Sequence, residues 1–249
     1  MSQSELTRIT DAGTPESSWK SLYKVGGATV LIAALLPLAE VAIGFLPGVA
    51  SASEKTVTVI DWFTLFQNHW FLGLRNLGLL NIVGAALLAP TVLVIYYVLR
   101  RDNQAYAALG TVLFFVGLAA YLAGNRAFGM LSLSGQYLSA ATDAQRSALI
   151  AAGQAMLAEG QSRAGLPLIE FACLVISAVM LRSSVFSKAT AYAGILGNVL
   201  LIVVEVILTI KRTLPAAGMA IAIAAGLSIM TWYILVGLKL LRLGTTPKS

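Results

Sequence analysis

The stretch from residue 188 to 212, KATAYAGILGNVLLIVVEVILTIKR, constrains what this chain can fold into more than any other feature. It is apolar over more than twenty residues, ends in basic residues and carries Asn198 and Glu205 in its middle part. A helix of about 20 apolar residues spans the roughly 30 Å hydrocarbon core of a bilayer. Asn198 and Glu205 are seven residues apart and therefore share one helix face. A carboxylate inside such a span needs a partner or a water-lined cavity, so the other helices must supply one.

The composition places most of the surface of this chain against lipid. Hydrophobic residues make up 58% of the 249 residues and charged residues only 11%, whereas soluble domains carry about 25% charged residues. The net charge of +6 comes from basic residues that stand singly or in pairs at the ends of apolar stretches, where they anchor helices to lipid head groups. No basic run with interleaved aromatic residues occurs, so we expect no nucleic-acid partner. The single Cys173 and single His69 allow no internal disulfide and no bis-histidine haem.

The apolar stretches predict an all-α, polytopic transmembrane helix bundle. We expect one domain over residues 21–244, between a polar N-terminal tail (1–20) and a C-terminal tail (245–249). Its six spans are expected at residues 25–46, 75–99, 104–123, 166–182, 188–212 and 215–242.

Two long connecting segments, 47–73 and 125–165, are each expected to contain an amphipathic interfacial helix. In the first, Asp61 is expected to cap a helix from Trp62 to about Leu72, with apolar residues at helical spacing. In the second, Thr142 and Gln145 match a capping box, which predicts a helix over 143–159. Both helices are too polar or too short to span, so we expect them at the membrane surface.

Small residues recur at regular spacing on three of the expected spans. Gly110, Gly117 and Gly124 repeat every seven residues on the third span. Residues four apart form a second type of stripe on the last two spans. Such faces let helix backbones approach closely, so we expect helix–helix contacts there. The stripes of the second type are Ala189, Ala193 and Gly197, and Ala216, Ala220, Ala224 and Ser228.

Six spans put both termini on one side, and basic residues are more numerous in the segments on that side. The positive-inside rule therefore predicts that both termini are cytoplasmic. In this orientation three carboxylates, those of Glu40, Glu170 and Glu205, fall in the outer half of the membrane. The ligand-pocket candidates are therefore Glu40, Asn76, Asn81, Glu170, Asn198 and Glu205, and the candidates for the rim of the pocket are His69, Arg75 and Arg126.

Two interpretations of these polar residues stay open. Three carboxylates at one depth cannot all remain ionised unless a cation, an arginine or water joins them. They could line an outward-open polar pocket roofed by the two connecting segments. They could equally form Glu–Arg and Glu–Asn hydrogen bonds that tie helix ends together. A metal site built from these glutamates and His69 has suitable ligand chemistry, but no tight spacing such as HExxH supports it, so we expect neither metal nor cofactor.

Three segments resemble a widespread bacterial family of six-span membrane proteins that is catalogued only as a domain of unknown function. The segments are VFSKATAYAGILGNVL (185–200), ATDAQRSALIAAGQAMLAEG (141–160) and WYILVGLKLLRLG (232–244). The resemblance extends over most of the chain after about residue 20. It implies six transmembrane helices and a helical loop between the third and fourth, and it implies no substrate.

These features favour a non-enzymatic protein of the bacterial inner membrane that binds or transports a lipid-like or small polar ligand in the outer-half pocket. Membrane lipids are its expected partners. One alternative is a structural or accessory subunit of a larger membrane complex, with other membrane subunits as partners, as the small-residue stripes and the long sixth span indicate. A further alternative is a metal-dependent intramembrane enzyme.

Overall fold

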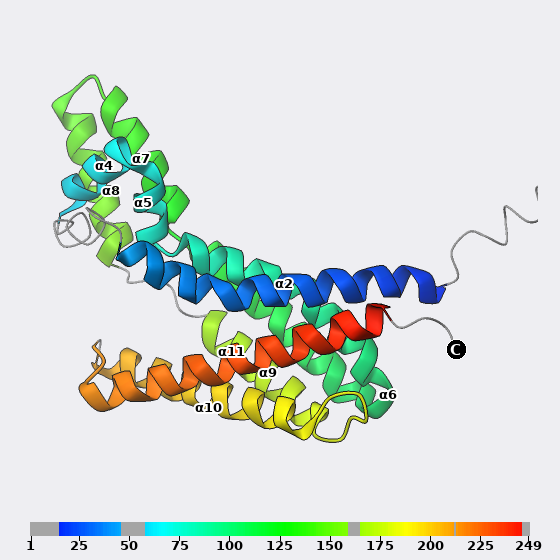
Figure 1. The fold of residues 1–249 in the computed structure, drawn as a ribbon. Coiled ribbons are helices and arrows are strands. Elements are labelled where there is room, and N and C mark those ends of the chain that lie inside the picture. Colours follow the sequence, from blue (N-terminus) through cyan, green and yellow to red (C-terminus); the bar gives the residue numbers. More distant parts are fainter. Residues whose placement is uncertain (1–14, 46–57, 159–164, 212, 246–249) are drawn as a thin grey trace, which may run out of the picture. The chain divides into compact units, whose positions relative to one another are not determined.

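A computed structural model describes residues 15–45, 58–158, 165–211 and 213–245. All regular secondary structure in these residues is helical, as expected for the fold class. Two compact units can be distinguished: Met1–Ala34, Leu87–Phe114 and Glu170–Ser249 form the first unit, and Leu35–Ala86 and Phe115–Ile169 form the second. The helices are α2 (Pro15–Gly44), α4 (Val59–Asn68), α5 (Trp70–Asn76), α6 (Leu79–Ala123), α7 (Ala127–Ser139), α8 (Asp143–Ala158), α9 (Gly165–Met180), α10 (Lys188–Lys211) and α11 (Ala216–Thr245) (Figure 1).

Among the described residues, 4 helical runs are long and apolar enough to cross a membrane: Trp19–Gly44, Leu79–Ser139, Lys188–Lys211 and Ala216–Thr245. The second run contains α6, whose helical geometry is interrupted at Asn103 (φ −158°, ψ 92°). The Asn103 side chain accepts a hydrogen bond from the backbone N–H of Tyr106 (3.2 Å), so it caps a new helix at this point. The two parts of α6, residues 79–102 and 104–123, therefore overlap the expected spans 75–99 and 104–123, although the first part begins four residues later than expected. Helix α9 has 16 residues, fewer than the roughly 20 that a perpendicular span needs, and the count of six spans stays a prediction.

In the first unit, two adjacent glycines let α2 pack closely against two helices at once. The Gly26 carbonyl accepts a hydrogen bond from Thr91 Oγ1 of α6 (2.7 Å), and a Cβ added at Gly26 would lie 3.2 Å from the Thr91 Cα. A Cβ at Gly27 would lie 3.0 Å from the Gly237 carbonyl oxygen of α11. Larger residues at these two positions would push the helices apart, which is the role of small residues in membrane helix packing.

The expected seven-residue glycine face on α6 packs against α9. In the first unit, a Cβ at Gly110 would lie 3.2 Å from the carbonyl oxygen of Ala172. In the second unit, a Cβ at Gly117 would lie 2.9 Å from the backbone nitrogen of Ile169. The prediction of a close helix contact on this face is therefore confirmed at both glycines.

Among the described residues, three members of the expected stripe on the last helix do not form a contact face, and the fourth, Ser228, is half-buried. Ala216, Ala220 and Ala224 are exposed, and α11 instead buries Gly218, Ala225 and Trp232, which repeat every seven residues. Trp232 determines which face of α11 is buried, because its large side chain is 1% exposed and fills the contact with α10. On α10 the expected stripe is only partly right, since Ala189 is exposed, Ala193 is half-buried and Gly197 is buried.

In the second unit, the helices of the two connecting segments form a cluster with an apolar core of its own. Each segment contains two helices where the sequence indicated one: α4 and α5 in the first, α7 and α8 in the second (Figure 1). Phe63, which is 1% exposed, packs in this core with Met130, which is 0% exposed. The Ser134 hydroxyl of α7 donates a hydrogen bond to the Phe63 carbonyl oxygen of α4 (3.0 Å). These four helices, which we call the short-helix cluster, thus bury their apolar faces against one another.

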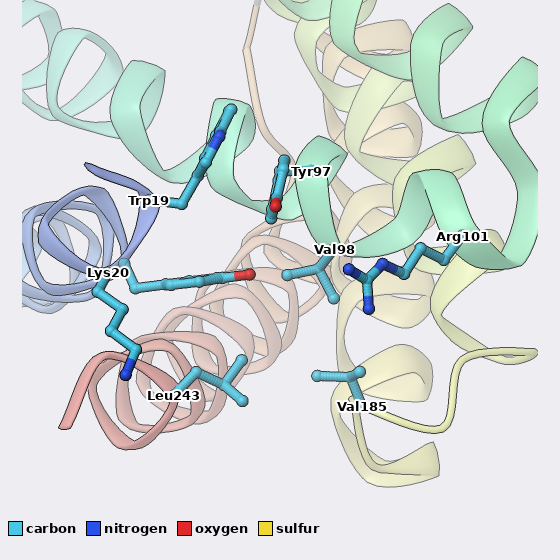
Figure 2. Close-up of a pocket in the computed structure, with 8 residues that line it drawn as sticks. Trp19, Lys20, Tyr97, Val98, Arg101, Val185 and Leu243 are labelled. Atoms are coloured by element: carbon cyan, nitrogen blue, oxygen red, sulfur yellow. The ribbon is translucent and has the colours of Figure 1, made fainter. Parts of the chain in front are cut away.

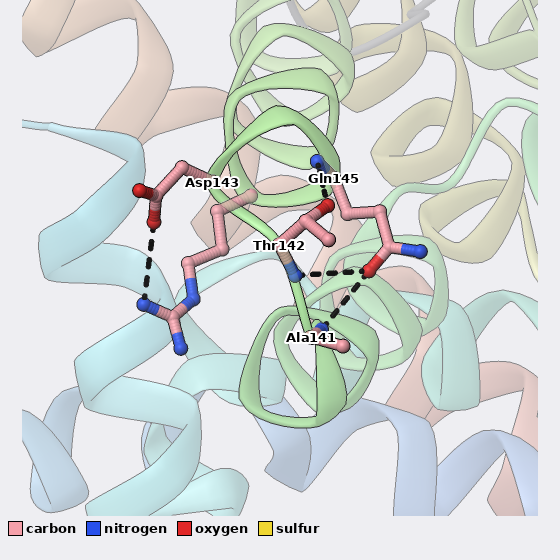
Figure 3. A network of polar contacts seen from close by, with 5 residues as sticks. Ala141, Thr142, Asp143 and Gln145 are labelled. Atoms are coloured by element: carbon pink, nitrogen blue, oxygen red, sulfur yellow. Dashed lines mark hydrogen bonds and ion pairs between the residues drawn. The ribbon is translucent and has the colours of Figure 1, made fainter.

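Capping boxes begin two of these helices. Thr142 was expected to cap α8, and its hydroxyl accepts a hydrogen bond from the backbone N–H of Gln145 (3.2 Å), while the Gln145 side chain accepts from the backbone of Thr142 (3.3 Å) (Figure 3). Helix α4 starts three residues before its expected first residue, because Thr58 and Asp61 form a capping box in which Asp61 is the third helical residue. The backbone leaves helical geometry at His69 (φ −147°, ψ 69°), so the expected continuous helix to Leu72 is instead two helices.

Candidate functional site

Four polar side chains are buried on neighbouring faces of α9 and α10 in the first unit. Glu170 and Ser177 are seven residues apart on α9 and are 6% and 0% exposed. Asn198 and Glu205 are seven residues apart on α10 and are 2% and 9% exposed. Residues at this spacing lie on one helix face, so the face of α10 predicted from the sequence is a buried polar face.

Gly194 is the point where α9, α10 and α11 come together. A Cβ added at Gly194 would collide with Ser177 Oγ of α9 and would lie 2.6 Å from Trp232 Nε1 of α11. The Asn198 side-chain amide donates a hydrogen bond to the Gly194 carbonyl oxygen (2.7 Å). Ser177, Trp232 and Asn198 therefore surround one glycine, and only the absence of a side chain there lets them converge.

Two hydrogen-bonding groups at this point have no partner in the described part of the chain: Ser177 Oγ and Trp232 Nε1. Several serine and threonine hydroxyls on the long helices bond to a carbonyl oxygen four residues earlier, as Thr209 does to Glu205 (2.8 Å) and Thr231 does to Leu227 (2.8 Å). A buried polar group without a partner costs about 1–3 kcal/mol. Two such groups at one place are unusual, since buried polar groups are almost always satisfied.

The buried polar region extends from Gly194 toward Glu170. The Glu170 carboxyl lies close enough to Cys173 of the same helix and to Tyr233 of α11 for its charge to act on both. We call the set of Glu170, Ser177, Asn198, Glu205 and Trp232, with Tyr233 beside it, the polar track. It is built from α9, α10 and α11 and lies entirely within the first unit.

A separate polar group, Glu40 with Arg75 and Asn76, lies in the second unit. Arg75 Nε is 3.1 Å from Glu40 Oε1. Arg75 Nη2 also donates to the backbone oxygen of Glu40 (2.8 Å), and Nη1 donates to Asn76 Oδ1 (3.0 Å). The guanidinium thus holds the end of α2 against α5 by its planar fork of donors. For Glu40, these contacts agree with the second interpretation of the polar residues, in which glutamates bond to arginine and tie helix ends together.

The remaining candidates belong to neither group. Asn81 and His69 are exposed. Arg126 donates through Nη1 to the carbonyl oxygens of Met156 (2.6 Å) and Leu157 (3.3 Å), and a cation is favourable there because these carbonyls belong to the last turn of α8. Glu40 belongs to one unit, and Glu170 and Glu205 belong to the other, so the common depth of the three carboxylates stays a prediction.

Two members of the polar track, Ser177 and Trp232, were not expected from the sequence. Ser177 follows Glu170 by seven residues, and this spacing on α9 is a signal that could have identified it. Trp232 lies inside a span, whereas tryptophans are enriched at the membrane–water interfaces, which is a second signal. Within the residues that the structure describes, no three His, Cys, Asp or Glu side chains gather as a group able to hold a metal ion.

Comparison with known proteins gives one match. A family model described as a domain of unknown function (DUF4386) matches residues 71–244. This range contains α6 to α10 and nearly all of α5 and α11, and it includes every residue of the polar track. No curated protein and no solved structure matches the chain.

Proposed function

The chain belongs to the DUF4386 family of unknown function, and from this premise we propose that it is a non-enzymatic membrane protein that binds or transports a small polar or lipid-like ligand at the polar track. We place it in the inner membrane of a bacterium with both termini in the cytoplasm, because basic residues are concentrated in the segments on that side. The ligand enters from the outer half of the membrane, where this orientation puts Glu170 and Glu205.

The observation that carries the proposal is the pair of buried donors without partners, Ser177 Oγ and Trp232 Nε1. An indole N–H can only donate, and a serine hydroxyl can donate or accept. The ligand therefore presents an acceptor oxygen, such as a hydroxyl, carbonyl or ester oxygen, to the two groups beside Gly194. The carboxyl groups of Glu170 and Glu205 favour a hydrogen-bond donor or a positive charge on another part of the same ligand.

The proposed site contains fewer residues than the site expected from the sequence. Glu40, Arg75 and Asn76 contact one another in the second unit, so we assign them to the packing of α2 against α5. The ligand-binding residues are Glu170, Ser177, Asn198, Glu205 and Trp232.

Native mass spectrometry of the gently solubilised protein tests this proposal. We expect wild-type protein to carry a bound small molecule or lipid, and Glu170→Gln and Glu205→Gln to reduce its occupancy by about tenfold or more, since a charged hydrogen bond contributes about 1.5–3 kcal/mol. The matched control is Thr209→Val, because the Thr209 hydroxyl is exposed and bonded to its own helix. A wild-type protein with no bound species, or glutamate variants that keep the occupancy of the control, would contradict the proposal.

A second candidate function, that of an accessory subunit in a larger membrane complex, is favoured by the exposed stripe on α11. Ala216, Ala220 and Ala224 are exposed in the described part of the chain, and small residues at this spacing are typical of helix–helix interfaces in membranes. Mild crosslinking in native membranes tests it: a partner crosslinked through this face supports the accessory role. A monodisperse monomer with no crosslinked partner counts against it.

A further inference from the structure

A second polar site lies in the first unit, at the ends of its long helices. A pocket of about 320 Å³ is enclosed by the start of α2, the middle of α6, the segment between α9 and α10, and the end of α11 (Figure 2). It shares no residue with the polar track.

The pocket forms beyond the point where three helices are held tightly together. Gly26 and Gly27 of α2 contact α6 and α11 at close range. Tyr23, Tyr97 and Leu243 line the pocket, and each lies one or two helical turns beyond this crossing. The backbones of α2 and α11 stay close beyond this crossing, since a Cβ added at Gly244 would lie 3.2 Å from the Lys20 carbonyl oxygen, and the pocket lies beside this contact.

Two cations from different helices line the pocket, Lys20 of α2 and Arg101 of α6, and no acidic side chain of the described residues lines it. Figure 2 shows the Arg101 guanidinium reaching toward the space between Val98 and Val185. A guanidinium presents donors in a planar fork that fits phosphate oxygens, and a lysine ammonium adds a second positive charge. The pocket is thus complementary to an anion with several acceptor oxygens.

A stacked aromatic pair fixes one wall. The Trp19 ring lies 3.8 Å from the Tyr97 ring at an interplanar angle of 14°. The Arg100 guanidinium lies 4.2 Å from the centre of the Tyr97 ring, so a third cation is held beside the pocket by a cation–π contact. Aromatic and basic residues at span ends are common in membrane proteins. Anchoring at the interface does not, however, require two stacked aromatic rings that line a pocket of this volume.

The rest of the lining is apolar. Val98, Val185 and Leu243 lie opposite the aromatic wall. A free phosphate ion gains nothing from these side chains, whereas a phospholipid can place its phosphate at the cations and the start of its acyl chains against the apolar residues. Basic pockets between membrane helices on the cytoplasmic side typically bind anionic lipid head groups.

We propose that this pocket binds the phosphate of an anionic phospholipid through Arg101 and Lys20. The expected orientation puts it at the cytoplasmic leaflet, where anionic lipids give the membrane surface its negative potential. This assignment is independent of the ligand at the polar track, because the two sites have no residue in common.

The test uses the full chain in nanodiscs of phosphatidylcholine with increasing fractions of phosphatidylglycerol, with the number of retained lipids read by native mass spectrometry. We expect saturable retention of phosphatidylglycerol in preference to phosphatidylcholine. Arg101→Gln and Lys20→Gln should each reduce that preference by about fivefold, as expected for one basic side chain at a membrane surface. Arg101→Lys keeps the charge without the fork and should give an intermediate loss.

Arg182→Gln is the matched control, because Arg182 is an exposed cation in the α9–α10 segment that does not line the pocket. A second arm offers inorganic phosphate both to protein in phosphatidylcholine alone and to protein that has retained phosphatidylglycerol. The proposal is overturned if phosphatidylglycerol is not preferred, if Arg182→Gln reduces the preference as much as Arg101→Gln, or if inorganic phosphate saturates the pocket and displaces retained phosphatidylglycerol at low concentration. Unchanged retention in the double variant Lys20→Gln, Arg101→Gln would overturn it as well.

Discussion

At the scale of single residues, the polar track depends on a glycine, because only a residue without a side chain fits where its helices meet. Gly194 brings Ser177 and Trp232 against α10, and a Cβ at this position would collide with the Ser177 hydroxyl. Gly226 lies on α11 with nothing within 4 Å of its would-be Cβ. Both glycines lie within long helices, but other side chains crowd Gly194 and the space around Gly226 is open. The two positions are therefore a matched pair for substitution.

We predict that Gly194→Ala lowers the thermal stability of the protein and that Gly226→Ala does not. Overpacking a filled interior costs about 1–3 kcal/mol, whereas alanine in an open helical position is neutral or stabilises by about 0.5–1 kcal/mol. Thermal unfolding of the two variants in the same detergent checks this. Equal midpoints for Gly194→Ala and wild type would mean that α9, α10 and α11 do not converge at this glycine.

At the scale of elements, the short-helix cluster is an independently packed part of the second unit. Phe63 of α4 contacts Tyr137 of α7, with ring centres 5.2 Å apart, and a Cβ added at Gly153 of α8 would lie 3.2 Å from the Phe63 ring. Three helices thus meet on one side chain. Because each of these helices is short, most of its stability must come from such packing.

We predict that Phe63→Ala destabilises the short-helix cluster by about 3–5 kcal/mol, while Trp70→Ala changes its stability by less than about 0.5 kcal/mol. Both residues are aromatic, but Phe63 is 1% exposed and Trp70 is 58% exposed. Amide hydrogen exchange in α7 and α8 measures the effect. Faster exchange in both variants, or in neither, would contradict the packing described for Phe63.

The sequence could predict those elements whose signals are local. The Thr142–Gln145 box, the buried face of Asn198 and Glu205, and the close contact at Gly110 all follow from spacings within one helix, and all are found. Helix α7 was missed because its three serines make the segment read as a loop, while its stabilising contacts, such as Ser134 to the Phe63 carbonyl, come from a distant part of the chain. The face of α11 was misassigned for the same reason, because its burial is decided by where Trp232 packs.

At the scale of the whole molecule, some buried polar residues hold helices together and others form the polar track. Arg75 forms an ion pair with Glu40 and a hydrogen bond to its backbone oxygen, and these contacts tie α2 to α5. The polar track leaves two donors without partners among the described residues. Many large apolar side chains on the long helices are exposed, including Leu35 (61%) and Val112 (60%), as expected for a lipid-facing surface. A buried polar track inside such a surface is costly unless something occupies it.

The most direct test of the central claim, that a ligand bonds to Trp232 and Ser177, is the ¹H–¹⁵N spectrum of the tryptophan side chains in nanodiscs. Trp232→Phe assigns its indole signal, and Trp62, which lies in the second unit, is the internal reference. We predict a hydrogen-bonded indole proton for Trp232 in the protein as purified, and a shift of this signal alone after exhaustive removal of bound molecules. A Trp232 signal without hydrogen-bonded character, or one that does not move on removal, would contradict the account.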